Sequence, residues 1–321
     1  MKGFDPKWRD PPDYIIGITK EIWEDRGVHT LRHRYSDDIP VRSPAALVLG
    51  NRAVIAATLS TLAEFPDRAL FGEDVIWSPH GEGFLSSHRL LSTATHAGDG
   101  AYGRATGARL RYRIIADCYA LGDRIVDEWL IRDQGAIVRQ MGLDPRSWAA
   151  ERIALEGGPE RCQRPFTPEQ DVAGPYDGRG DDHPVGREHA GILSRIMEGD
   201  LRCIPEIYDR AATLEGPGGL THASWPAIDH FWLSLRASFP NAEFRIHHQI
   251  GREDARMPPR SALRWSLDGR HEGFGAFGEP TGARVHVMGM SHAEFGPRGL
   301  RREWVLFDET AIWKQILLHT G

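Results

Sequence analysis

Two aspartates occupy equivalent places in this chain and have the right chemistry for proton transfer. Asp133 and Asp308 each follow a predicted final strand and precede a predicted closing helix, in EWLIRDQGAIVRQ and EWVLFDETAIWKQ. A carboxylate can act as general acid and base when partial burial raises its pKa toward neutrality. The alternative is that each aspartate only caps the helix that follows it.

The two aspartates belong to a duplicated segment. Residues 86–140 align without a gap with residues 261–315, and seventeen of the fifty-five pairs are identical. The match continues upstream, where AEFPDRALF aligns with ASFPNAEFR. A repeat of this length buries its own core, so the sequence predicts two domains, 1–142 and 188–321. Gly, Pro and charged residues are concentrated in 143–187, which indicates a linker.

Each half has the pattern of helices followed by strands. Apolar residues recur at helical spacing around residues 15–23 and 54–62, and short alternating runs over 109–121 and 124–132 indicate strands. The second half repeats this order, with helices expected over 192–211 and 225–240, strands over 284–295 and 300–308, and a closing helix. Helices followed by consecutive antiparallel strands predict an α+β fold.

Composition limits the classes of function. The chain has 321 residues, a formal net charge of −6 and no Lys- or Arg-rich run, so a nucleic-acid surface is not expected. No signal segment or apolar run long enough for a membrane span is recognisable, which predicts a cytoplasmic protein without a membrane partner. The three cysteines are scattered, and His247 and His248 would point to opposite faces of a strand, so no metal site is predicted.

The repeated motif carries a family resemblance. Both halves contain H-x-G-x-G-x-[YF]-G-x-x-T-G-A-R followed by E-W-x-x-x-D. This order resembles the SnoaL-like polyketide cyclases of the nuclear transport factor 2-like superfamily, in two tandem copies. The resemblance implies two cone-shaped (cystatin-like) domains, each a strongly curved antiparallel sheet wrapped around helices with an internal pocket. The motif glycines, such as Gly98 and Gly273, are then expected in loops and at strand bends.

The resemblance also implies roles for individual residues. In SnoaL-like cyclases the aspartate that resembles Asp308 and Asp133 is the acid and base of an aldol closure that needs no cofactor. Polar pocket residues are expected on the neighbouring strand, where alternation places His292 and Glu294 on one face. These two are predicted to assist Asp308, and further pocket or core positions are expected at Asp117, Tyr119, Trp232, Trp265 and Met290. The repeated Glu-Trp pairs are interpreted as structural, with each Glu bonded to the backbone or bridged to Arg109 or Arg284.

Two functions therefore stay open. The first is a cofactor-free cyclase, isomerase or lyase that acts on a small apolar carbonyl compound in the second domain. The second is a protein that binds a small hydrophobic molecule without chemistry, with one domain as a structural partner. The two domains could pair within one chain as a pseudo-dimer, or between chains as a homodimer.

Overall fold

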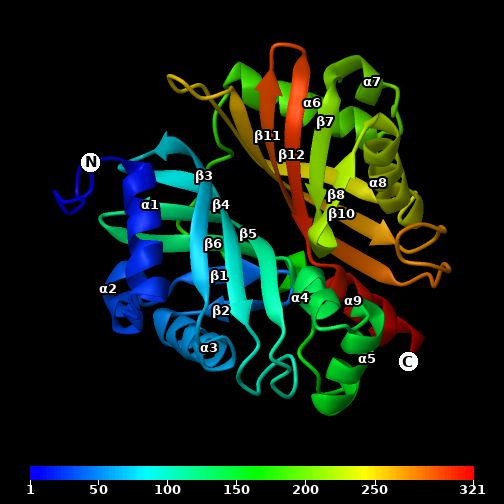
Figure 1. The fold of residues 1–321 in the computed structure, drawn as a ribbon, viewed down its shortest axis with the longest axis horizontal. Coiled ribbons are helices and arrows are strands. Elements are labelled where there is room, and N and C mark those ends of the chain that lie inside the picture. Colours follow the sequence, from blue (N-terminus) through cyan, green and yellow to red (C-terminus); the bar gives the residue numbers. More distant parts are fainter. The chain divides into compact units, whose positions relative to one another are not determined.

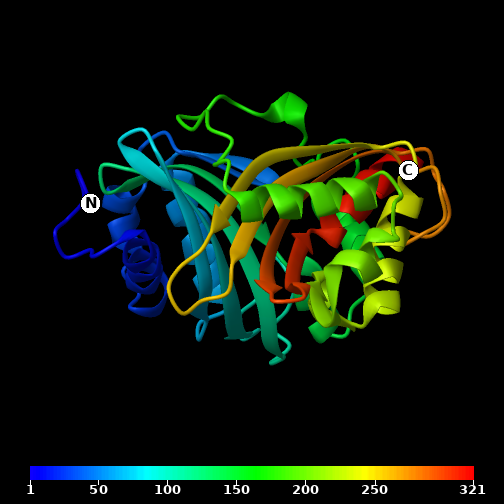
Figure 2. The same ribbon diagram turned by 90° about the horizontal axis from the view of Figure 1, so that it is seen from above.

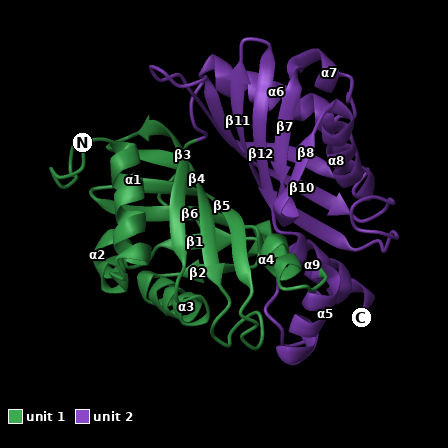
Figure 3. Cartoon of the chain, in the orientation of Figure 1, with its two compact units in different colours: residues 1–144, 166–178 green, residues 145–165, 179–321 purple.

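The computed structural model describes all residues, 1–321, and divides them into two compact units (Figure 3). Unit 1 comprises residues 1–144 and 166–178, and unit 2 comprises residues 145–165 and 179–321. The segment 143–187, which composition marks as a linker, is divided between both units and contains a helix that the sequence pattern does not predict. No helix combines the length and the apolarity that a membrane span requires.

Unit 1 is an α+β fold with a six-stranded sheet (Figure 1). Its sheet has the order β2-β1-β6-β5-β4-β3, in which β3 to β6 are antiparallel neighbours and β1 pairs with β6 in parallel. The elements are α1 (Pro11–Thr19), η1 (Lys20–Glu24), η2 (Val28–Thr30), α2 (Leu31–Arg34), β1 (Pro40–Ser43), β2 (Ala46–Leu49), α3 (Asn51–Glu64), β3 (Ala69–His80), β4 (Gly83–Thr95), β5 (Arg109–Leu121), β6 (Arg124–Arg132), α4 (Gln134–Gln140) and η3 (Pro168–Gln170).

Unit 2 repeats this architecture with the sheet order β8-β7-β12-β11-β10-β9. Figure 2 shows α6, in green, alongside the gold strands β9 and β10. The elements are α5 (Pro145–Leu155), α6 (Pro184–Met197), α7 (Cys203–Ile207), β7 (Tyr208–Gly216), η4 (Pro217–Gly219), β8 (Leu220–Ala223), α8 (Trp225–Ser238), β9 (Glu243–Arg252), β10 (Arg260–Arg270), β11 (Arg284–Gly296), β12 (Gly299–Phe307) and α9 (Glu309–Thr320). The prediction of two tandem α+β domains is confirmed.

The sequence pattern misplaces some elements. The helix expected over 192–211 ends earlier, and β7 begins at Tyr208. The hairpins β1–β2 and β7–β8 precede the long helices α3 and α8, whereas the pattern predicts only helices there. These strands have only four residues in three of the four cases, which is too short for a clear alternation.

Most of the repeated residues hold the elements together. His96 and His271 contact the hydroxyls of Thr106 and Thr281 through Nδ1, at 3.0 and 3.1 Å. The motif glycines lie in the loops after β4 and β10 and not within bending strands. A Cβ on Gly98 would come within 2.1 Å of a carbonyl oxygen of α3, so the glycine permits this loop to pack on the helix.

The core of unit 2 lies between its sheet and the helices α6 and α8. Trp232 of α8 and Trp265 of β10 are fully buried at its centre. Gly289 of β11 makes room for one of these indoles, because a Cβ at that position would lie 2.2 Å from Trp265 Cζ2. The interior of unit 2 is therefore filled by aromatic side chains, and β11 is built to admit them.

We expect Gly289→Ala to destabilise the protein by about 1–3 kcal/mol, because the new methyl group would overpack the Trp265 indole. Gly191 is the control, since it is an exposed position in α6 where a Cβ would meet nothing within 4 Å. Gly191→Ala should stabilise α6 by about 0.5–1 kcal/mol. Urea unfolding curves measure both changes, and an unchanged midpoint for Gly289→Ala would contradict the packing argument.

Candidate functional site

The strand register divides the predicted site residues of unit 2 between two faces of its sheet. Trp265 faces the helices and donates from Nε1 to Ser291 Oγ at 3.0 Å. His292 is the next residue of β11 and pairs with Trp304 of β12, so it lies on the other face. Glu294 shares that face with His292, as alternation predicts. Met290, His292 and Glu294 thus lie on one side of the sheet, and Trp232 and Trp265 on the other.

The corresponding residues of unit 1 have the same arrangement. Ala116 and Cys118 of β5 belong to the core beneath the helices. Asp117 and Tyr119 therefore point to the opposite face, where Asp117 is opposite Trp129. Tyr119 donates its hydroxyl to the carbonyl oxygen of His80 at 3.3 Å. The helix-covered interior of unit 1 is consequently lined by residues other than Asp117 and Tyr119.

Asp133 and Asp308 are helix N-caps. Asp308 Oδ1 accepts hydrogen bonds from the backbone N–H groups of Thr310 (2.8 Å) and Ala311 (3.3 Å) and from the Thr310 hydroxyl. Asp133 Oδ1 accepts from the N–H of Ala136 at 3.0 Å. Both carboxylates are buried. In each case one carboxylate oxygen satisfies the N-terminus of the last helix, α4 or α9.

A glutamate–tyrosine pair lies inside both units, and the sequence analysis did not foresee it. Tyr208 donates its hydroxyl to Glu303 Oε2 at 2.7 Å in unit 2, and in unit 1 Tyr35 lies close enough to Glu128 for each to shift the pKa of the other. Parallel pairing of β7 with β12, and of β1 with β6, brings these residues together. The predicted bridge of each Glu to an arginine is wrong, because Arg109 and Arg284 are exposed whereas both glutamates are buried.

The Glu128 carboxyl of unit 1 has a strongly shifted pKa. Burial raises the pKa of Glu128 from 4.5 to about 7, the Tyr35 hydrogen bond works against this shift, and the neighbouring Asp127 adds to it. Burial and Glu128 together hold the pKa of Tyr35 well above its usual value. Glu128 can therefore exchange a proton near neutral pH, while Tyr35 remains a hydrogen-bond donor.

A histidine also lies in the interior of unit 1. His88 of β4 points to the same side of the sheet as Ala116, its partner in β5. Its Nδ1 lies 3.4 Å from Ser86 Oγ, and burial lowers its pKa to about 4. His88 is thus neutral at physiological pH and can act as a hydrogen-bonding group rather than a cation.

The interiors of the two copies differ in polarity. Unit 1 carries polar residues at several interior positions where unit 2 carries apolar ones. Read from unit 1 to unit 2, the aligned pairs are Thr58 and Trp232, Arg68 and Ala242, His88 and Leu263, Ser92 and Leu267, Tyr112 and Val287, and Arg132 and Phe307. Because the two copies have the same fold, that fold does not require these polar groups.

The polar residues inside unit 2 form one closed cluster. His189 of α6 contacts Ser261 Oγ through Nδ1 at 2.8 Å, and its Nε2 lies 3.5 Å from Glu303 Oε1. Tyr208 completes the cluster through its bond to Glu303. All four side chains are at most 2% exposed. The cluster lies in a packed core, although His189 Nε2 and Glu303 Oε1, which face each other, have no hydrogen-bond partner.

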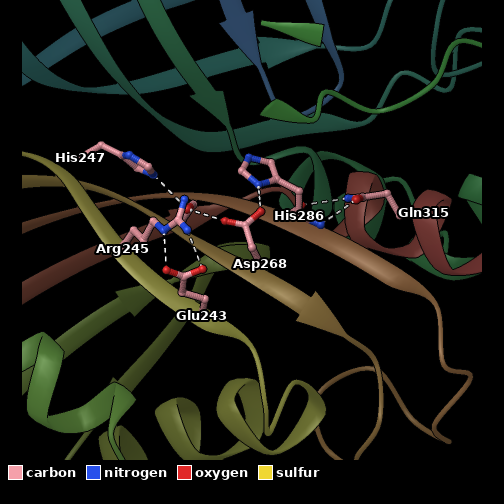
Figure 4. Close-up of polar contacts among 7 residues, drawn as sticks. Glu243, Arg245, His247, Asp268, His286 and Gln315 are labelled. Atoms are coloured by element: carbon pink, nitrogen blue, oxygen red, sulfur yellow. Dashed lines mark hydrogen bonds and ion pairs between the residues drawn. The ribbon is translucent and has the colours of Figure 1, made fainter. Parts of the chain in front are cut away.

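A second polar network of unit 2 lies on the other face of its sheet (Figure 4). Ser266 donates to Asp268 Oδ2 at 2.7 Å and lies 2.9 Å from His247 Nε2, and Asp268 Oδ1 lies 2.5 Å from His286 Nδ1. Gln315 of α9 binds the backbone N–H and carbonyl of His286. Because the Ser266 proton is held by a carboxylate and not by a histidine base, this arrangement does not activate a nucleophile.

Comparison with known proteins supports the resemblance. The model of the SnoaL-like domain matches residues 191–303, which lie in unit 2. IdmH from Streptomyces antibioticus, described as a candidate polyketide cyclase, is a similar solved structure, with 21% identity over 42% of this chain and 100% of its own, at a TM-score of 0.36. A candidate polyketide cyclase from Acidithiobacillus ferrooxidans has 18% identity over 40% and 92%, at 0.35. No curated protein matches the chain.

The capping geometry predicts how substitutions of Asp308 behave. Asp308→Ala should cost about 1 kcal/mol of stability, because the first turn of α9 loses its side-chain acceptor. Asp308→Asn should retain most of the stability, since asparagine is an equally good N-cap. Thermal unfolding of both variants measures the difference, and an Ala variant as stable as the wild type would rule out the capping role.

The raised pKa of Glu128 predicts a pH-dependent stability. The folded pKa of about 7 exceeds the ordinary 4.5, so this group stabilises the fold most below pH 4.5, and that contribution is lost as pH rises through 7. Relative to Glu128→Gln, the wild type should lose about 3 kcal/mol of unfolding free energy over this range. Urea unfolding at several pH values measures the change.

Tyr35→Phe is the matched variant for this measurement. Tyr35 lowers the pKa of Glu128, so removal of its hydroxyl should raise that pKa and move the midpoint of the pH dependence upward. A difference between the wild type and Glu128→Gln that is independent of pH would show that Glu128 titrates normally.

Proposed function

We propose that unit 1 is the functional unit and that its interior is an acid–base site for a small, largely apolar carbonyl compound, used without a cofactor. Glu128 is the group that moves the proton. The observation that carries this proposal is a buried carboxyl with a pKa raised to about 7, beside Tyr35, inside the copy that keeps polar residues in its core.

The chemistry follows from the ionisation of the pair. An ionised Glu128 can remove a proton next to a carbonyl group, and the neutral acid can return it to another atom. Return to carbon is an isomerisation, whereas attack of the enolate on a second carbonyl, followed by protonation of the new alkoxide, is an aldol-type cyclisation. Tyr35 orients the carboxylate through its hydroxyl.

Access to the interior supports the choice of unit 1. Tyr35, Leu130 and Arg132 face the interior, yet each remains partly accessible to solvent. Tyr35 and Arg132 are nevertheless enclosed deeply by protein. Groups that are both enclosed and accessible are typical of a cavity wall. In unit 2 the equivalent of Arg132 is Phe307, which is 4% exposed and part of the packed core.

The alternative function is binding of a small hydrophobic molecule without chemistry. The packed aromatic interior of unit 2 favours a structural role for that unit under either function. The two functions differ in whether a bound carbonyl compound exchanges protons with water.

Exchange of the α-protons of simple apolar ketones in D2O, followed by NMR, tests the proposal. Wild-type protein should accelerate exchange of at least one ketone in a small panel, and Glu128→Gln should lower that rate about 100-fold or more. Glu303→Gln is the matched control, because it changes the same pair in unit 2 and should leave the rate unchanged.

Asp308→Asn addresses the aspartate that the family resemblance singles out. Loss of exchange in Asp308→Asn together with full exchange in Glu128→Gln would place the chemistry in unit 2 and contradict the proposal. Binding of the ketones without any exchange would favour the alternative function.

A further inference from the structure

Two arginines reach into the interior of unit 1 at the end opposite Glu128. Arg68 lies in the turn between α3 and β3, donates from Nε to Ser92 Oγ at 3.3 Å, and lies with its guanidinium 4.3 Å from the ring centre of Trp23. Arg132 ends β6 and pairs with Ile114 of β5, on the interior side. Arg132 is close enough for its charge to help lower the pKa of Arg68, after the larger effect of burial.

Each guanidinium group has a buried donor atom without a partner. Arg68 Nη1 and Arg132 Nε are buried and have no hydrogen-bond partner in the protein. Arg68 is 4% exposed and makes no ion pair. The charge of Glu64 favours the charged form of Arg132, although its carboxylate already accepts from the N–H groups of Ala101 and Tyr102 at 3.1 and 2.7 Å. Arg68 has no such counter-charge, and a buried charge without one is costly in a protein interior.

The second copy shows that the fold does without this arrangement. Ala242 and Phe307 stand where unit 1 has the two arginines, and Leu267 and Val287 replace Ser92 and Tyr112. All four replacements are buried apolar residues of the core of unit 2. The fold therefore does not require the two arginines.

We infer that Arg68 and Arg132 form an anion subsite that binds a carboxylate of the substrate. A guanidinium presents a fork of donors that matches a carboxylate, and the inward-facing N–H groups would find their acceptors there. Ser92 and Tyr112 add hydroxyl groups beside them.

This subsite would define the substrate class of the proposed function. It rests on that function, because Glu128 marks the place of the reacting carbon. Arg132 and Glu128 lie on the same face of β6, four residues apart, which is about 13 Å of strand. The substrate class is then an apolar carbonyl compound with a carboxylate several carbon atoms away from the carbon that loses its proton.

Binding of 3-phenylpropionate and of 3-phenylpropionamide, measured by isothermal titration calorimetry, tests the subsite. The two probes share an apolar body and differ in charge. Wild-type protein should bind the carboxylate at least about ten-fold more tightly than the amide. Arg68→Met and Arg132→Phe should reduce this preference to less than about two-fold, since each removes one fork of donors.

Three controls make the outcome decisive. Arg109→Gln changes an exposed arginine of the same unit and should leave the preference intact. Glu128→Gln should also bind the carboxylate, so failure of the acid–base proposal and failure of the subsite are distinguishable. Arg68→Met should be at least as stable as the wild type, because a buried charge without a counter-charge has been removed.

Equal affinity of the wild type for the carboxylate and the amide would overturn the inference. A preference that persists in both arginine variants would also overturn it. If both variants fail to fold, the comparison of the two probes on the wild-type protein decides alone.

Discussion

The parallel pairing of a short strand with the last long strand is the constraint on which each unit depends. Tyr35, which precedes β1, forms a parallel bridge with Ile125 of β6 and so lies near Glu128, and because β7 lies beside β12, Tyr208 meets Glu303. The Glu of each repeated Glu-Trp pair is thereby fixed inside, and alternation along the neighbouring strand then assigns every other side chain to a face. One buried hydrogen bond thus determines which residues can reach a ligand.

The two copies use this shared frame differently. Unit 2 fills its interior with Trp232 and Trp265 and keeps a closed polar cluster around Glu303. Unit 1 keeps polar side chains and charge at the equivalent positions, among them Arg68 and Arg132. A packed apolar core stabilises a domain, whereas a buried charge costs stability unless it is paired and hydrogen-bonded. Unit 2 thus has the features of a structural domain, and unit 1 has those of a domain with a functional site.

The sequence predicts the architecture better than the site, for a physical reason. The duplication indicates two α+β units, and alternation correctly places His292 and Glu294 on a common face. Alternation does not say whether that face is the one covered by the helices, because β11 is buried on both sides for most of its length. The apolar pattern that normally marks the inner face is therefore missing. The Glu–Tyr pairs depend on parallel contacts made by β1, which has four residues, and by β7, which has nine. No local sequence pattern reveals such long-range contacts. The remaining information about the site comes from comparing the two copies at interior positions, such as Arg132 and Phe307.

The position of a bound ligand tests the central claim, that the interior of unit 1 is the working site, most directly. A crystal structure with 3-phenylpropionate would provide it. The account predicts that the carboxylate lies between Arg68 and Arg132 and that the apolar body extends toward Glu128. A ligand found in unit 2, beside Trp232 or beside His292 and Glu294, would contradict the account.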